Sequence, residues 1–155
     1  GDNNSYTSFV TGNSNKTKLT IGDSSDPTTA SSNNTVTETI TGDSNTVLQN
    51  LIGNYITSGI VITGSSNQIT QQLKSSQGTS TITLIGNSNV LFTEQTDSGI
   101  HTLTENVTGS FNSITTQQQG NNNTTLNLVT TGNDNTITVR TSSTTIVNPQ
   151  TAIAR

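Results

Sequence analysis

The sequence predicts an all-β protein: a parallel β-solenoid, or β-arcade, with two strands in each turn of about 22 residues and about six rungs. Three observations favour this fold. Apolar residues make up only 26% of the chain, too few for the wide core of a globular enzyme. A four-residue motif that begins with Gly recurs at spacings of 30, 22, 22, 23 and 23 residues. Between these motifs, apolar residues fall at alternate positions, which is the period of a β-strand.

The recurring motif, here called the corner motif, consists of Gly, then Asn, Asp or Ser, then any residue, then Asn. The predicted rung-corner glycines are Gly12, Gly42, Gly64, Gly86, Gly109 and Gly132. The Asn residues at the fourth position are Asn15, Asn45, Asn67, Asn89, Asn112 and Asn135. A buried polar side chain is costly unless it is paired, so we expect these Asn residues to pair from rung to rung in a structural ladder, as in cross-β stacks.

The corner motifs divide the chain into rungs of one solenoid domain over residues 1–155. We expect a partial rung at 1–11, followed by rungs at 12–41, 42–63, 64–85, 86–108, 109–131 and 132–155. The first full rung is eight residues longer than the next one, and its turn-forming segment 22–29 predicts an inserted corner loop.

A second turn half-way through each rung divides it into two strands, one after the corner motif and one before the next. The alternating columns of these strands define the side chains that should point inward. The predicted apolar core is Val47, Ile69, Leu91, Ile114, Ile137, Ile40, Ile62, Leu84 and Val107. The same columns hold the predicted core glutamines Gln49, Gln71, Gln95 and Gln118. Stacked rungs can bury these faces together, which a single rung cannot do.

Composition and charge exclude several function classes. The net charge of −4 leaves nothing to neutralise phosphates, so we expect no nucleic-acid partner. No apolar run approaches the roughly 20 residues of a membrane-spanning helix, so no membrane insertion is expected. The chain has no Cys, which excludes disulfides and thiolate metal sites. We expect no enzyme activity and no cofactor.

Three ionisable side chains are candidates for catalysis. His101 is the only His and follows a Ser-Gly-Ile corner without a matching triad signature, so we expect it to face solvent. Glu38 and Glu105 share an inward column but lie three rungs apart, about 14 Å at the strand spacing of a sheet. Carboxylate pairs in glycosidases lie about 5–9.5 Å apart. We therefore expect each Glu either to lie near an end of the core or to be exposed by a local shift.

Two binding functions are also conceivable. Aspartates at predicted corners could hold calcium, but the dense Gly-Gly-x-Gly-x-Asp repeat of calcium-binding β-rolls is missing, so we expect a turn role and no metal. The aspartates are Asp2, Asp23, Asp26, Asp43 and Asp134. An outward Thr-x-Thr array could bind ice, and this alternative stays open although only two of five rungs carry both threonines. The successive pairs are Thr37/Thr39, Gly59/Val61, Thr81/Thr83, Thr104/Asn106 and Asn127/Val129.

Two segments carry a resemblance to a known family. Residues 45–54 (NTVLQNLIGN) and 112–123 (NSITTQQQGNNN) begin a strand with Asn, place an apolar residue two positions later and end at a Gly-Asn corner. Over a 22-residue period with two strands, this pattern resembles the curlin repeat, found in subunits of curli-type functional amyloid fibres on bacterial surfaces. The resemblance implies secretion, head-to-tail stacking into a fibre, a biofilm-matrix or adhesion role, and a secretion or nucleator partner.

The two ends of the predicted solenoid favour self-assembly. Residues 5–10 already follow the strand pattern, and neither a capping helix nor a charge-blocked edge strand is evident, although Pro149 interrupts the last rung. We expect a homopolymer with copies of itself, with Leu48, Phe92 and Tyr55 facing outward or lying at corners. The start at Gly1 without Met is typical of a mature, secreted form, which predicts an extracellular or cell-surface location. The alternative is a solenoid stalk of a phage fibre or adhesin.

Overall fold

A computed structural model describes residues 3–22, 33–52, 55–74, 77–96, 100–119, 124–142 and 147–153, with side-chain burial up to Thr141. The predicted inserted loop at 22–29 lies outside these residues from Asp23 onward. In chain order the strands are β1 (Ser5–Thr11), β2 (Lys16–Ile21), β3 (Thr35–Thr41), β4 (Thr46–Leu51), β5 (Thr57–Thr63), β6 (Gln68–Leu73), β7 (Gly78–Ile85), β8 (Val90–Thr96), β9 (His101–Thr108), β10 (Ser113–Gln119), β11 (Thr124–Thr131), β12 (Thr136–Ser142) and β13 (Val147–Ile153).

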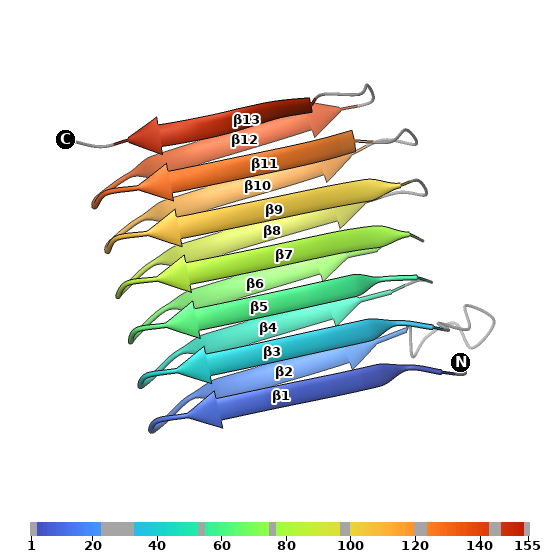
Figure 1. Cartoon of the computed structure of the whole chain (residues 1–155), viewed down its shortest axis with the longest axis horizontal. Helices are drawn as coiled ribbons and strands as arrows, with labels where there is room; N and C mark the ends of the chain where they lie inside the picture. The colour runs from blue at the N-terminus through green and yellow to red at the C-terminus, as the bar shows by residue number, and fades with distance from the viewer. Residues whose placement is uncertain are drawn as a thin grey trace.

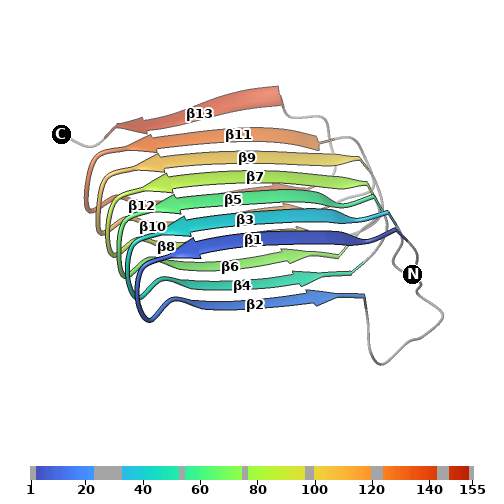
Figure 2. The same cartoon turned by 60° about the horizontal axis from the view of Figure 1, so that its bottom comes forward.

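The strands form two parallel sheets, which confirms the predicted all-β solenoid. The odd-numbered strands make a seven-stranded sheet from β1 to β13, and the even-numbered strands make a six-stranded sheet from β2 to β12. Figure 1 shows the strands stacked in chain order, and Figure 2 shows the two sheets facing each other with the connecting corners at their ends. No helix in the described part of the chain is long and apolar enough to span a membrane.

Rung-to-rung pairing follows the sequence columns. Val47 pairs with Ile69, Ile69 with Leu91, and Leu91 with Ile114, so one apolar column runs through four successive rungs. The 23-residue rungs keep this register because their extra residue lies outside the paired columns. The predicted period of about 22 residues, with two strands per turn, is therefore confirmed.

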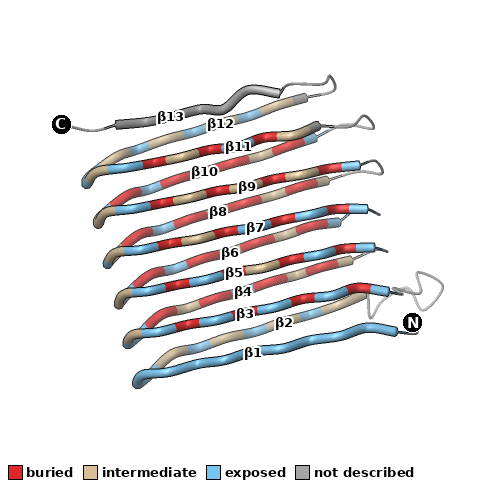
Figure 3. The backbone as a smooth tube through the Cα atoms, viewed as in Figure 1, coloured by how far each residue is buried: buried red, intermediate tan, exposed pale blue. Residues whose placement is uncertain are grey.

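The core is a thin apolar layer between the two sheets. Buried and more exposed residues alternate along the internal strands, as the red and paler bands of Figure 3 show. All predicted core residues up to Ile114 on this layer are buried, and Ile137 near the top is half-buried against them. Leu48 and Tyr55 are exposed, and Phe92 is half-buried on the outer face, which agrees with their predicted outward or corner positions.

The corner motifs require their glycines for two reasons. Gly86 has a φ of +141°, a region that residues with a side chain rarely adopt. A Cβ added there would lie 1.7 Å from the carbonyl oxygen of Gly109 in the next rung. Two positions later, Ser88 adopts the left-handed conformation with a φ of 56°. Each corner is thus a tight arc whose closest approach to the next rung leaves no room for a side chain.

Candidate functional site: the polar ladders and the open rung ends

The asparagines of the corner motifs form a continuous hydrogen-bonded column, the main Asn ladder, as predicted. The Nδ2 of Asn67 donates to the Oδ1 of Asn45 in the rung below at 3.1 Å and to the carbonyl of Gly86 in the rung above at 2.8 Å. The backbone N–H of Asn67 donates to the same Oδ1 at 3.0 Å. Five Asn-to-Asn side-chain bonds of 2.8–3.1 Å connect all six asparagines. A buried amide is therefore satisfied by its two neighbours in the stack.

The main Asn ladder has a direction. In every step the upper Asn donates two hydrogens, from its backbone N–H and its Nδ2, and the lower Asn accepts both on its Oδ1. At the N-terminal end, Asn15 uses one Nδ2 hydrogen on the carbonyl of Gly42 above it, at 2.6 Å, and its downward donors point away from the other described rungs. At the C-terminal end, the Oδ1 of Asn135 is the acceptor that an additional rung would use. The two ends of the ladder are thus complementary, donor below and acceptor above.

A second, shorter ladder lies at the opposite corner, and the column pattern did not predict it. The backbone N–H and Nδ2 of Asn34 donate to the Oδ1 of Asn4 at 3.1 and 2.8 Å. The N–H of Ile56 donates to the Oδ1 of Asn34 at 3.1 Å, and the column continues with apolar Ile56. The repeated Asn-Asn pairs at 3–4 and 33–34, just before predicted strands, were the available signal.

The predicted core glutamines are buried, and the lower ones form a connected network. The Nε2 of Gln71 donates to the Oε1 of Gln49 at 3.0 Å and to the Oγ of Ser58 at 2.8 Å. The Oγ of Ser80 donates to the Oε1 of Gln71. Higher in the stack, Gln95 and Gln118 are also buried, but the Oε1 of Gln95 and both amide atoms of Gln118 have no hydrogen-bond partner among the described residues. The glutamines of the core are therefore fully bonded only in its lower half.

Glu38 pairs with Ser8 of the end strand β1, so it lies near an end of the core, and no local shift exposes it. Its side chain is 2% exposed and accepts hydrogen bonds from the Oγ of Ser8 at 3.3 Å and the Nε2 of Gln49 at 3.1 Å. Burial raises the pKa of Glu38 above its ordinary value, and the hydrogen bonds from Gln49 and Ser8 partly oppose this rise. Hydrogen-bond donors in the core, not a displacement of the strand, make this position tolerable for a carboxyl group.

For Glu105 both expectations were wrong, because β9 is an internal strand and no local shift exposes the side chain. Glu105 is fully buried, and burial raises its pKa to about 7. Its Oε2 accepts a hydrogen bond from the Oγ1 of Thr93 at 3.2 Å, and its Oε1 has no partner in the described part of the chain. Strand pairing places Glu38 and Glu105 three strands apart through Ile60 and Ile82, as the spacing predicts, so they do not form a carboxylate pair.

The prediction for His101 was wrong as well. His101 is the first residue of β9 and is fully buried. It pairs with Gly78 of β7, where an added Cβ would lie only 2.9 Å from the Cδ2 of Leu73. The described residues contain no group of three or more His, Asp or Glu side chains that could hold a metal ion.

The N-terminal end of the solenoid is an open strand edge. All seven residues of β1 are exposed, which Figure 3 shows as a continuous pale blue strand. Tyr6 and Val10 pair with the buried Val36 and Ile40, so they belong to inward columns, yet they are 43% and 45% exposed. No described element covers them. Apolar side chains that belong to the core columns are therefore exposed to solvent at this end.

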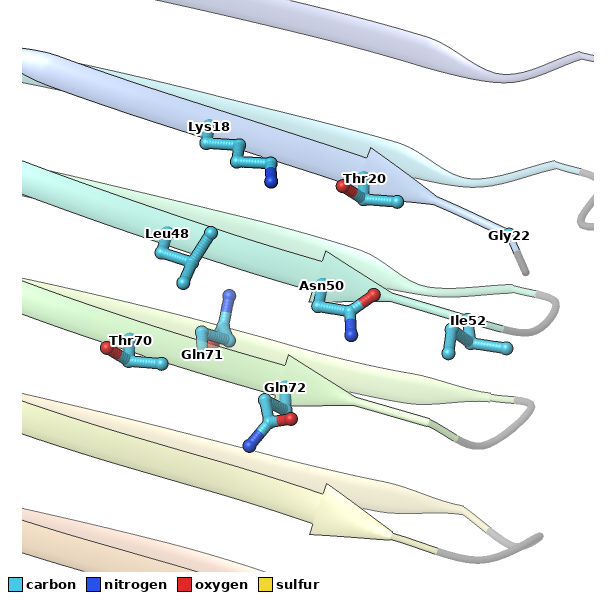
Figure 4. A pocket seen from close by; sticks show the side chains of 9 residues that line it. All are labelled: Lys18, Thr20, Gly22, Leu48, Asn50, Ile52, Thr70, Gln71 and Gln72. Atoms are coloured by element: carbon cyan, nitrogen blue, oxygen red, sulfur yellow. The ribbon is translucent and has the colours of Figure 1, made fainter. Parts of the chain in front are cut away.

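The outer face of β2, β4 and β6 also contains a hollow, which Figure 4 shows. Lys18 contributes its charge, and amide, hydroxyl and aliphatic groups complete the wall. The lining residues are Lys18, Thr20, Gly22, Leu48, Asn50, Ile52, Thr70, Gln71 and Gln72. This set contains no carboxylate, thiol or imidazole that could act as a nucleophile or general base.

The fold and its ladders define this chain as a parallel β-solenoid repeat protein. Comparison with protein-family models, with curated proteins and with solved structures gives no match. The candidate functional site is therefore the pair of complementary rung ends, together with the polar ladders that lead to them.

Proposed function

We propose that this chain is a structural subunit that polymerises head to tail, by stacking of β-strands, into an extracellular amyloid-like fibre. The observation that carries the proposal is the complementarity of the two ends of the main Asn ladder. In five internal steps of the ladder, the upper Asn donates its backbone N–H to the Oδ1 of the Asn below. With the same geometry, the N–H and Nδ2 of Asn15 can donate to the Oδ1 of Asn135 of a second copy. The same geometry directs the Nδ2 of Asn135 to the carbonyl of Gly12 in that copy.

Backbone groups at the two ends support the same joint. Inside the solenoid, the N–H of Gly42 donates to the carbonyl of Thr11 at 2.9 Å, and this bond recurs at each corner motif up to Gly132. A second copy above the C-terminal end extends the series by a bond from its Gly12 to Thr131. Every internal rung is thus a template for the joint, and stacking of this kind is steeply favourable.

The curlin-like identity and the cell-surface location belong to this proposal. The Asn and Gln ladders supply the physical basis of the resemblance, because both residue types are buried and bonded between successive rungs. The homopolymer is the principal partner assigned, with a secretion or nucleator partner expected from the resemblance. No metal, cofactor or reaction is assigned.

The experiment is electron microscopy with fibre diffraction on purified protein at micromolar concentration. The expected result is unbranched filaments with a meridional reflection at about 4.7–4.8 Å. A stable, monodisperse monomer would overturn the proposal and favour the stalk alternative.

A matched pair of variants separates stacking from other association. Val10→Lys places a charge in an inward column that a joint would bury, whereas Phe9→Lys changes the neighbouring, outward side chain, which is 66% exposed. We expect Val10→Lys to remain folded and monomeric and Phe9→Lys to form filaments. Equal polymerisation of the two variants would contradict a joint at β1.

Ice binding receives no support from the strand register. Thr37 pairs with Gly59, which pairs with Thr81, and Thr39 pairs with Val61, so the outward threonine pairs are interrupted in the second of three successive rungs. An ice-binding face needs an unbroken array, and we therefore do not propose this function.

A further inference from the structure

The two sheets contain unequal numbers of described strands, and this affects the joint. The odd-numbered sheet has seven strands and the even-numbered sheet has six. Six two-strand turns, from β1–β2 to β11–β12, are followed by β13 alone on the top edge of β11, as Figure 1 shows. Copies that keep the odd-numbered sheet on the same side of the stack can continue both sheets without a gap only if each contributes the same number of strands to both.

The glycine corners determine which strand must leave. The corner at Gly12 connects β1 to β2, and the corner at Gly132 connects β11 to β12. Stacking the first corner on the second places the incoming β1 on β11 and the incoming β2 on β12. The position on β11 is the one that β13 occupies in the single chain. The main Asn ladder therefore cannot continue across a complete joint while both β13 and the incoming β1 are in place.

Backbone geometry shows that β13 is a poor template for another strand. Pro149 pairs with Asn127 of β11, which is in an outward column. In this sheet the N–H groups of outward-column residues bond to the strand above, as Thr35 does to the carbonyl of Ile56 at 2.9 Å. The missing N–H of Pro149 therefore faces the open edge of β13 and costs no bond to β11. Proline in this position is a recognised device for blocking an edge strand.

By contrast, β1 is held by side-chain bonds as well as by pairing. All seven of its residues pair with β3. The Oδ1 of Asn4, beside β1, accepts two hydrogen bonds from Asn34, and the Oγ of Ser8 donates to Glu38. Displacement of β1 would break this inner network.

On the basis of the proposed fibre function, we propose that β13 is a displaceable capping strand. It covers β11 in the free subunit, and the β1 strand of an incoming second copy replaces it at the joint. The surface that recognises the partner is the top edge of β11 with the corner at Gly132, and the occupant is β1 with the corner at Gly12.

The test locks β13 in place with an engineered disulfide in the full chain. The chain has no native Cys, so Val129→Cys with Thr151→Cys introduces a single pair at residues that are directly paired in the register. Adjacent strands lie about 4.8 Å apart, which is within the Cα separation that a disulfide accepts. We expect the oxidised variant to form no filaments and the reduced variant to form them as the unmodified chain does.

A second measurement shows that the locked subunit is folded and competent at its other end. Its β1 remains free to join a growing end, but its own β11 stays covered. A small fraction of oxidised variant added to the unmodified chain should therefore terminate growth and shorten the filaments, and a reducing agent should reverse the effect. Unchanged filament length would overturn the proposal.

Two control locks complete the design. Thr83→Cys with Asn106→Cys links the internal strands β7 and β9 and should polymerise in both redox states. Phe9→Cys with Thr39→Cys links β1 to β3 and should also permit growth. If this β1 lock blocks growth while the β13 lock does not, the displaced strand is β1 and the proposal is overturned.

The outcomes distinguish the capping strand from the fibre itself. If the unmodified chain forms no filaments at all, the fibre function fails, and the capping role fails with it. If the unmodified chain forms filaments and the oxidised β13 lock grows equally well, the fibre function stands and strand displacement is overturned.

Discussion

The side-chain amide of Asn67 lies 3.1 Å from the Oδ1 of Asn45, twenty-two residues earlier in the chain, and both side chains are buried. The same amide also reaches the carbonyl of Gly86 in the following rung. One side chain thus joins three rungs. This relationship explains how a chain with so few apolar residues maintains an ordered stack, and it suggests the first prediction.

Asn67→Ala should lower the free energy of unfolding by about 3 kcal/mol, because it removes two donated bonds and leaves the buried N–H and amide of Asn89 without their acceptor. Urea denaturation of the monomer measures the loss. Asn127→Ala, at an exposed outward position, is the control and should change stability by less than about 0.5 kcal/mol. Similar losses for the two variants would mean that the ladder does not stabilise the stack.

Gly86→Ala should be among the most disruptive single-methyl substitutions. The added Cβ would lie 1.7 Å from the carbonyl oxygen of Gly109, at a φ of +141°, so we expect a loss of more than about 3 kcal/mol. Gly59→Ala is the matched control: its Cβ would meet only the Oγ1 of Thr37, at 3.3 Å, and the change should stay within about 1 kcal/mol. Thermal unfolding monitored by circular dichroism distinguishes the two. A soluble, wild-type-like Gly86→Ala protein would contradict the close stacking of the corners.

Glu105 should make stability depend on pH. Its folded-state pKa of about 7 lies above the ordinary value of 4.5, so the folded chain binds more protons than the unfolded chain between these values. The contribution of Glu105 to stability is therefore fully present below about pH 4.5. It declines by roughly 3 kcal/mol as the pH rises to about 7. Burial raises the pKa of Glu38 in the same direction.

The measurement is the free energy of unfolding between pH 4 and 8. Glu105→Gln should remove most of the slope, whereas Glu94→Gln, on the outer face, should preserve it. An unchanged slope in Glu105→Gln would contradict a raised pKa of Glu105 in the folded state.

Gln71→Leu should destabilise the chain by about 2 kcal/mol despite its greater hydrophobicity. The substitution removes the acceptor of the buried Ser80 hydroxyl and the donor to Gln49 and Ser58. Gln72→Leu, whose amide bonds to Glu94 on the half-buried outer face, is the control and should cost less than about 1 kcal/mol. A stabilised Gln71→Leu protein would mean that the core prefers apolar filling at this position.

The fold could be predicted because each inward position recurs in several rungs, so several residues indicate it independently. Val47, Ile69 and Leu91 indicate the same inward position, so a single polar exception such as Thr17 does not obscure the register. The Gly and Asn of each corner motif are determined by close approach and by hydrogen bonding, both of which leave a clear sequence signal. The strands, the core and the main Asn ladder therefore follow from the columns.

The environments of the ionisable residues could not be predicted in the same way. Burial of Glu38 depends on donors from Ser8 and Gln49, which are distant in sequence and belong to different strands. His101 directly follows a predicted turn, yet it is the first inward residue of β9 and pairs with Gly78 in the rung below. Such contacts between rungs occur at one position only. The residue types that recur in a column therefore do not indicate them.

The orientation of the strand-to-strand hydrogen bonds has a mechanical consequence. These bonds connect each rung to the next, along the direction in which the rungs stack, so a pulling force along the stack loads them one strand at a time. The chain should then open sequentially from an end, and each released rung of 22 residues should add about 75 Å of extended chain. Single-molecule extension would show a regular series of small steps, in contrast to the single large event of a protein with one global core.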